Sequence, residues 1–312
     1  MDTHGVYFSA NDAVLDWALP FLRSFRTFNP ELRLILIPFD DHCDGLIKLQ
    51  NQFNFEIYQD ESFAELERIG QRLELGHSSY GPYWFRRYAS FWGPLESFLY
   101  LDVRQIILCD LTEFVLAPQK YGLDLVHYDT NINQVYNEGE LRTDLLKRGL
   151  ARGFLSGLWS SKKHLFSLEE FVARADECVD IRGQLNLRNT DQFFINYCCD
   201  MRSINYAHWA GLKSDIVWES WAGQLGECYF DKDAQCYKIW NYGGHNHLKR
   251  VVLMHWAGYP LESWVPHYRH LKTFGLKTKF SKPLSDLPGR LLRSIKANRH
   301  LNQFCKSFKE PR

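Results

Sequence analysis

A carboxylate and an arginine interrupt a strongly apolar stretch, Phe98–Leu111, whose sequence is FLYLDVRQIILCDL. A short apolar run rich in aromatic and β-branched residues, preceded by the turn residues Gly93-Pro94, predicts a buried central strand. A carboxylate at the end of such a strand is costly unless a cation or a ligand satisfies it. Open α/β sheets bind their ligands beyond the carboxyl ends of the strands. Asp102 is therefore a candidate functional residue, with the capping of a turn as the alternative.

Arg104 follows this carboxylate by two residues. A guanidinium presents its donors in a rigid fork that matches carboxylates and phosphates. Beside the end of a strand, this side chain is a candidate for binding an anion. The alternatives are an exposed arginine in a loop or an ion pair with Asp110.

The elements that must position these side chains alternate between strands and helices. The predicted strands, besides the central one, are Gly5–Ala10, Leu32–Phe39, Phe55–Tyr58, Leu123–Tyr128, Gly153–Trp159 and Val251–Trp256. The predicted helices are a segment from Asn11-Asp12 to Phe28, which Pro20 should kink or break, and Glu61–Leu75, Tyr83–Trp92, Lys163–Val179 and Thr190–Cys199. This alternation is typical of a nucleotide-binding α/β domain, although the sequence contains neither GxGxxG nor GxxxxGK[ST].

The composition indicates one well-filled domain with a basic tail. Hydrophobic residues make up 45% of the 312 residues and aromatic residues 15%, which excludes a disordered chain. The net charge is zero, but residues 264–312 hold 12 Lys/Arg and only 2 Asp/Glu. We expect this segment to meet an anionic membrane surface or the acidic body itself, and we expect no nucleic-acid partner. The predicted domains are 1–265 and a basic, partly amphipathic helical extension, 266–312.

Cysteine usage and the N-terminus point to the cytoplasm. The eight scattered cysteines form no CxxC pair, which favours reduced thiols over a disulfide framework. The start of the chain, MDTHGVYFSAND, does not resemble a signal peptide, and no apolar run approaches the roughly 18 residues that span a bilayer. We expect a cytoplasmic protein, with peripheral contact at the inner face of a membrane if Leu287–Phe308 forms a basic amphipathic helix. A terminal helix packed on the acidic body is the alternative.

The order of these segments resembles glycosyltransferase family eight, which includes glycogenin and bacterial galactosyltransferases. The likeness is spread over residues 5–264. The motifs that carry it are Ala10-Asn11-Asp12 after the first strand, Tyr100-Leu101-Asp102 followed by IILCDL, Phe154-Leu155-Ser156-Gly157, Thr190-Asp191-Gln192 followed by Asn196, and the closing His255, Gly258 and Trp264. Each motif is weak by itself, and their order carries the resemblance.

This resemblance implies the GT-A fold of nucleotide-diphospho-sugar transferases, a Rossmann-like mixed α/β sheet flanked by helices. It also implies a retaining hexosyltransferase that moves a hexose from a nucleotide-diphosphate sugar, in the first instance a UDP-sugar, to a saccharide or lipid-linked acceptor, as in polysaccharide biosynthesis. The alternative is a catalytically silent sugar-nucleotide or glycan-binding protein on the same fold. A nucleotidyltransferase is a second rival, but it would require a glycine-rich basic loop where SANDAVL stands.

In the family, two aspartates of a D-x-D motif and a late histidine hold Mn²⁺ or Mg²⁺, which stabilises the leaving diphosphate. Asp102 and His255 match two of these ligands, but Arg104 stands at the second aspartate. Three interpretations stay open. Arg104 binds the diphosphate itself and the enzyme is metal-independent, or Arg104 points away and Asp102, His255 and one further group hold a metal, or the site is inactive.

The resemblance also implies roles for other residues. Asp191 and Gln192 would be the catalytic groups beside the anomeric carbon and the acceptor, although Asp191 is equally suited to cap its helix. Arg87 is preferred over Arg86 for contact with a phosphate. Leu155 replaces an asparagine of the family, so the identity of the donor sugar stays open. The remaining residues expected to contact the nucleotide sugar are Ala10, Asn11, Asp12, Val103, Ser156 and Gly258.

Overall fold

The computed structural model describes residues 3–75, 81–188, 190–221, 227–240 and 248–255. The chain divides into two units, Met1–Leu276 and Lys277–Arg312, and every described residue belongs to the first. The predicted domain boundary at residue 265, the basic extension, Gly258 and Trp264 lie outside the described residues.

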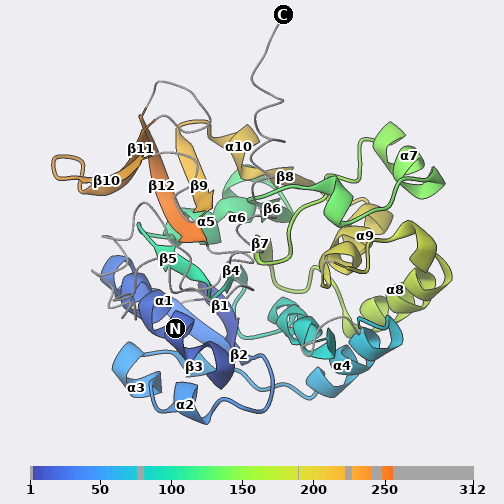
Figure 1. Cartoon of the computed structure of the whole chain (residues 1–312), viewed down its shortest axis with the longest axis horizontal. Coiled ribbons are helices and arrows are strands. Elements are labelled where there is room, and N and C mark those ends of the chain that lie inside the picture. Colours follow the sequence, from blue (N-terminus) through green and yellow to red (C-terminus); the bar gives the residue numbers. More distant parts are fainter. Residues whose placement is uncertain (1–2, 76–80, 189, 222–226, 241–247, 256–312) are drawn as a thin grey trace, which may run out of the picture. The chain divides into compact units, whose positions relative to one another are not determined.

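The first unit is built on a seven-stranded sheet with the strand order β3-β2-β1-β4-β7-β6-β8 (Figure 1). Its strands are β1 (His4–Ala10), β2 (Arg33–Pro38), β3 (Glu56–Ile57), β4 (Ser97–Asp102), β6 (Leu125–His127), β7 (Leu158–Lys162) and β8 (Tyr206–His208). β1 runs parallel to β2 and β4, whereas β7 runs antiparallel to β4 and β6. The predicted fold class, a mixed α/β sheet flanked by helices, is confirmed.

Helices cover both faces of this sheet because successive strand residues point to opposite sides. The α-helices are α1 (Leu15–Phe28), α2 (Asp44–Ile47), α3 (Gln50–Phe53), α4 (Phe63–Arg72), α5 (Thr112–Val115), α6 (Ala117–Tyr121), α7 (Glu140–Lys147), α8 (Leu168–Asp180), α9 (Gln192–Arg202) and α10 (Trp209–Leu212). The 3-10 helices are η1 (Asp12–Val14), η2 (Gly81–Phe91), η3 (Ile132–Gln134) and η4 (Arg182–Gln184). Phe8 of β1 lies in one apolar core with residues of α1, whereas Tyr7 lies in a second core with residues of α4, α8 and α9.

A second sheet places His255 next to the seven-stranded sheet. It contains β10 (Glu227–Asp231), β11 (Cys236–Trp240), β12 (Leu248–His255) and β5 (Gln105–Ile107), in that order, and β9 (Ile216–Trp221) pairs with β12. The predicted single strand within Phe98–Leu111 is therefore two strands, β4 and β5, in two different sheets. The polar insert after Leu101 is the break between them, because it turns the chain from one sheet into the other.

Two further predictions differ from the structure. Of the predicted kink or break at Pro20, the break is wrong: α1 continues through Pro20 because it buries Trp17, Phe21 and Phe25. Burial contributes about 2 kcal/mol for each such side chain and outweighs the roughly 3 kcal/mol cost of an interior proline. The strand predicted at Gly153–Trp159 begins only at residue 158, because residues 156–157 form a turn and Phe154 makes only an isolated bridge with Thr130.

The six cysteines whose side chains the structure describes are free thiols, namely Cys43, Cys109, Cys178, Cys198, Cys199 and Cys236. Within the described residues, no helix combines the length and the apolar character that a membrane crossing requires.

His127 at the end of β6 couples stability to pH. Its side chain is buried and its ring stacks on Phe154, with 5.3 Å between the ring centroids. Burial, and then the neighbouring His208, lower the pKa of His127 to about 3. In the unfolded chain this pKa is about 6.5. The unfolded state therefore binds the extra proton between these pH values, so stability falls as the pH drops from about 6.5 to 3, by at most about 1.4 kcal/mol per pH unit.

We expect His127→Phe, which keeps an aromatic ring against Phe154, to flatten the decline of the unfolding free energy between pH 6.5 and 4. Urea unfolding followed by circular dichroism at each pH measures this slope. His42→Phe is the control, because the His42 side chain is 88% exposed and its loss should leave the slope unchanged. An unchanged slope in His127→Phe would show that His127 is not the titrating group.

Candidate functional site

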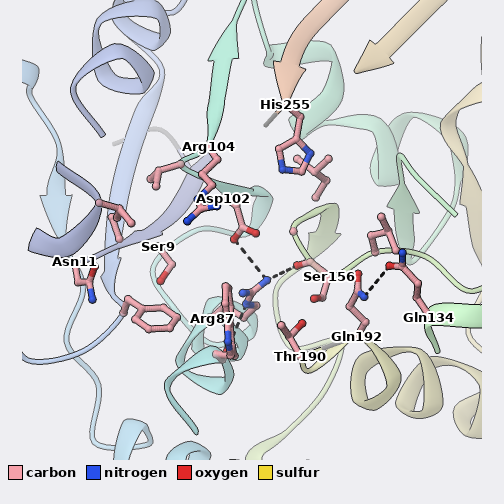
Figure 2. Close-up of a pocket in the computed structure, with 18 of the residues that line it drawn as sticks. Ser9, Asn11, Arg87, Asp102, Arg104, Gln134, Ser156, Thr190, Gln192 and His255 are labelled. Atoms are coloured by element: carbon pink, nitrogen blue, oxygen red, sulfur yellow. Dashed lines mark hydrogen bonds and ion pairs between the residues drawn. The ribbon is translucent and has the colours of Figure 1, made fainter. Parts of the chain in front are cut away.

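A cavity of about 520 Å³ opens at the ends of β1, β4 and β12 and at the start of α9 (Figure 2). It is lined by Ser9, Ala10, Asn11, Val14, Phe39, Trp84, Arg87, Asp102, Val103, Arg104, Gln134, Leu155, Ser156, Gly157, Leu158, Arg188, Thr190, Gln192 and His255. The carboxyl ends of two parallel strands, β1 and β4, meet here, which is where open α/β sheets bind ligands.

Asp102 and His255 both line this cavity. Asp102 is the last residue of β4, and the pairing of β12 with β5 places His255 opposite Gln105, directly after Arg104. Figure 2 shows Asp102 between Arg104, His255 and Arg87. Strand pairing therefore brings the two predicted metal ligands to one cavity, while their role toward a ligand stays a prediction.

Arg87 on η2 is the most heavily contacted cation of the cavity. Its Nε donates to the Trp84 carbonyl at 3.0 Å and its Nη1 to the Ser156 carbonyl at 2.7 Å. The same guanidinium forms ion pairs with Asp102 Oδ1 at 3.6 Å and Asp191 Oδ2 at 3.5 Å. Burial disfavours the charged form, but the two carboxylates outweigh burial and raise the pKa of Arg87 above its ordinary value. Arg87 is therefore a fixed positive charge.

The neighbouring Arg86 is directed elsewhere. It pairs with Glu67 Oε1 at 2.6 Å and with Asp41 Oδ1 at 2.8 Å, and it does not line the cavity. Of the two arginines, the structure thus places the preferred one, Arg87, at the cavity. Its contact with a phosphate stays a prediction.

Asp191 is not among the residues that line the cavity, and its expected catalytic role stays a prediction. Its side chain is fully buried. Oδ1 accepts hydrogen bonds from Ser156 Oγ at 2.8 Å and Thr190 Oγ1 at 3.1 Å, and Oδ2 faces Arg87. It does not cap α9 with its side chain either. In this structure, Asp191 holds Arg87 and Ser156 from behind the cavity wall.

Gln192, the first residue of α9, does line the cavity. Its Nε2 donates to Oε1 of Gln134 on η3 at 3.2 Å (Figure 2). Asn196, one turn further along α9, donates to the carbonyls of Gln192 and Phe154 at 2.8 and 2.7 Å and accepts from the Phe154 N–H at 2.9 Å. These bonds fix the start of α9 to the segment that precedes β7.

The Asp12 carboxylate is engaged with the backbone of the protein, and its expected contact with the nucleotide sugar stays a prediction. Its carboxylate accepts hydrogen bonds from the backbone N–H groups of Gly45 at 2.8 Å and Leu46 at 3.1 Å, at the start of α2. It does not line the cavity. The sequence could not separate the two roles, because a carboxylate after a strand suits either one.

The other predicted contacts in the described chain do line the cavity. They are Ala10, Asn11, Val103 and Ser156. Asn11 is held in place because its Nδ2 donates to Asp40 Oδ2 at 2.7 Å. Aromatic residues that sequence reasoning did not select, Phe39 and Trp84, join them with ring centroids 5.0 Å apart.

Two more arginines, Arg104 and Arg188, line the cavity. The Arg104 guanidinium lies over the Trp17 ring, 5.9 Å from its centroid. No acceptor among the described residues forms an ion pair or a side-chain hydrogen bond with either guanidinium, so the predicted alternative of an Arg104–Asp110 pair is not formed. Asp102 is the one carboxylate among the described lining residues. The cavity is therefore suited to an anion.

The side chains present do not reproduce the metal-binding set of the resembling family. Within the described part of the chain, no three His, Cys, Asp or Glu side chains are grouped so that they could hold a metal ion. Asp102 and His255 supply two donors. Arg104 stands where the D-x-D motif has its second aspartate, and its positive charge repels a divalent cation.

Gly157 explains how the Asp102 carboxylate fits against the cavity wall. The Asp102 N–H donates to the Gly157 carbonyl at 3.0 Å. A Cβ at Gly157 would lie 2.7 Å from Asp102 Oδ2, so any larger residue would push this carboxylate aside.

Comparisons with known proteins identify the fold. No protein-family model matches the sequence, and no curated protein sequence is significantly similar to it. An active-site mutant of LgtC matches with a TM-score of 0.53 at 14% identity, over 91% of this chain and 98% of that chain. The galactosyltransferase LgtC with donor and acceptor sugar analogues matches over the same shares with a TM-score of 0.50 at 13% identity. At the level of fold, these matches confirm the predicted resemblance to GT-A structures related to glycosyltransferase family eight.

The positioning role of Asp191 can be tested by stability. Asp191→Asn keeps the side-chain shape but removes one of the two charges that stabilise the buried Arg87. Loss of one partner of a buried ion pair costs about 3–5 kcal/mol, and because Asp102 remains, we expect the unfolding free energy to fall by about 3 kcal/mol. Urea unfolding measures this change.

Asp41→Asn is the matched control, because Asp41 pairs with the adjacent Arg86 and its side chain is 85% exposed. Because Asp41 lies largely in solvent and the buried Arg86 keeps its second partner Glu67, we expect a loss of at most about 1 kcal/mol. Equal small losses in the two variants would contradict the role given to Asp191.

Proposed function

We propose that this chain, which has the GT-A fold of LgtC, is a glycosyltransferase that moves a hexose from a nucleotide-diphosphate sugar, a UDP-sugar in the first instance, to a saccharide or lipid-linked acceptor. The observation that carries the proposal is the cavity at the carboxyl ends of β1 and β4, where the arginines Arg87 and Arg104 outnumber the single carboxylate of Asp102. The diphosphate of a sugar nucleotide is the kind of anion that such a cavity would bind.

We assign the nucleoside to the end of the cavity formed by Asn11, Phe39 and Trp84, which offers an amide and two aromatic faces. The diphosphate would then lie near Asp102, Arg104 and His255, the side chains grouped in Figure 2. The sugar would extend toward Gln192.

Arg104 is the side chain that we expect to stabilise the leaving nucleotide. When the bond between the anomeric carbon and the diphosphate breaks, negative charge builds up on the diphosphate oxygens. A guanidinium aimed at this charge lowers the barrier because it favours the transition state more than the ground state. Arg104 has no acidic partner among the described residues, so its charge is available for this task.

Retention of the anomeric configuration is part of the proposal. The amide oxygen of Gln192 is a poor nucleophile, so we expect the acceptor to attack from the face that the diphosphate leaves. The anomeric configuration of the product, read by NMR, tests this point.

The location remains a proposal as well. We propose that the protein works in the cytoplasm and that residues 266–312, through their positive charge, contact an anionic membrane that carries the lipid-linked acceptor.

Turnover of UDP- and GDP-sugars tests the central proposal. Free UDP or GDP is measured with purified protein in Mn²⁺ and in EDTA. We expect release of nucleotide in both conditions, and we expect Arg104→Gln to lower the rate about 10²-fold, as for the loss of one oxyanion-stabilising donor. Arg68→Gln is the control, because Arg68 pairs with Glu65 on α4 and lies outside the cavity. Tight nucleotide binding without turnover of any donor would favour the catalytically silent alternative.

A second variant reverses the charge at the same position. Arg104→Asp restores the D-x-D pattern beside His255, so we expect its turnover to become dependent on Mn²⁺ and to stop in EDTA. Comparison of its activity in Mn²⁺ and in EDTA measures this switch. If wild-type turnover already stops in EDTA, the assignment of the diphosphate charge to Arg104 is wrong.

A further inference from the structure

The end of the cavity away from Asn11 is built from η3 and the start of α9. Figure 2 shows Gln134 and Gln192 together at this end, with Thr190 beside them. Leu155 adds an apolar side chain to the lining. This end would face the transferred sugar and its acceptor, so its polar groups decide which substituents are recognised.

The neutral polar groups at this end are largely engaged within the protein. Gln192 Nε2 donates to Gln134 Oε1 at 3.2 Å. Thr190 Oγ1 donates to the buried Asp191 at 3.1 Å. These bonds leave each group with less capacity to bind sugar hydroxyls.

Arg188 belongs to the same end of the cavity. Its segment is tied to η3 because Asn186 Nδ2 donates to the Asn133 carbonyl at 2.7 Å and the Asn186 N–H donates to the Val135 carbonyl at 2.9 Å. The Arg188 N–H in turn donates to Asn186 Oδ1 at 3.0 Å. The backbone that carries Arg188 is therefore anchored beside Gln134.

In the described part of the chain, the backbone of Arg188 is held by hydrogen bonds, whereas its guanidinium is not. It is exposed and lines the cavity, and within the described residues it has no ion pair or hydrogen bond. The other exposed or half-buried arginines nearby do have partners, since Arg142 donates to Asn133 and Arg182 pairs with Glu74. An anchored but unpartnered guanidinium that lines a cavity is suited to an anionic ligand.

We propose that Arg188 binds an anionic group, a carboxylate or a phosphate, on the sugar that is transferred or on its acceptor. The proposal rests on the proposed function and narrows its substrates to those that carry a negative charge beyond the diphosphate. A carboxylate would accept two parallel hydrogen bonds from the guanidinium, which Lys cannot reproduce.

Paired substrates that differ only in charge separate the two sources of the anion. Donor binding to the full chain is measured by calorimetry with UDP, UDP-glucose and UDP-glucuronate. Acceptor KM is measured with glucose, glucuronate and glucose 6-phosphate. If the anion is on the donor, UDP-glucuronate binds more tightly than UDP-glucose; if it is on the acceptor, the charged acceptors have the lower KM.

Arg188→Gln should lower the preference for the charged substrate of each pair about tenfold or more, because one charge-assisted hydrogen bond is lost. The affinity for UDP should stay unchanged. Arg188→Lys should retain only part of the preference for the charged substrate. Arg148→Gln is the control, because Arg148 is an exposed arginine at the C-terminal cap of α7 that pairs with Asp144, and this change should leave the preference unchanged.

Three results separate failure of this inference from failure of the proposed function. Equal use of neutral and charged substrates, unaffected by Arg188→Gln, overturns the inference alone. Weaker binding of UDP itself in Arg188→Gln also overturns it, because Arg188 would then belong to the diphosphate. Absence of UDP and GDP binding by the wild-type chain overturns both.

Discussion

A guanidinium held between two carboxylates is the interaction on which the site depends. An isolated charge buried as deeply as Arg87 would cost several kcal/mol. Here two backbone carbonyls and the carboxylates of Asp102 and Asp191 satisfy it. These partners come from η2, from β4 and from the segments before β7 and α9. One side chain thus fixes the relative positions of the segments that form the cavity wall.

This arrangement decides which charges are left for a ligand. Asp102 is already paired with Arg87, so its negative charge is partly compensated before any substrate binds. Arg104 and Arg188 line the same cavity without a carboxylate partner in the described part of the chain. A guanidinium supplies one positive charge and directed hydrogen bonds, whereas a divalent metal supplies two charges and acts as a Lewis acid. If the proposed function is correct, this protein uses a guanidinium at the position where the family that it resembles uses a divalent metal.

The sequence predicted the fold class and the convergence of Asp102 with His255 at one cavity, because motif order and buried strands are readable without coordinates. The sequence also favoured Arg87 over Arg86 as the arginine at the cavity. Asp191 and Asp12 are assigned to the ligand by the resemblance alone, because their segments match motifs of the family. Only tertiary contacts, with Arg87 for one and with the start of α2 for the other, show how the two carboxylates are engaged within the protein. Arg188 and Gln134 lie on irregular segments, where no periodicity marks a residue that lines a cavity.

The claim that arginine replaces a metal at the diphosphate is tested most directly by calorimetric titration of UDP into the full-length protein in EDTA, repeated after addition of Mn²⁺. The account predicts binding in EDTA, with an affinity that Mn²⁺ leaves unchanged and that rising salt concentration weakens. Binding that begins only when Mn²⁺ is added would contradict it.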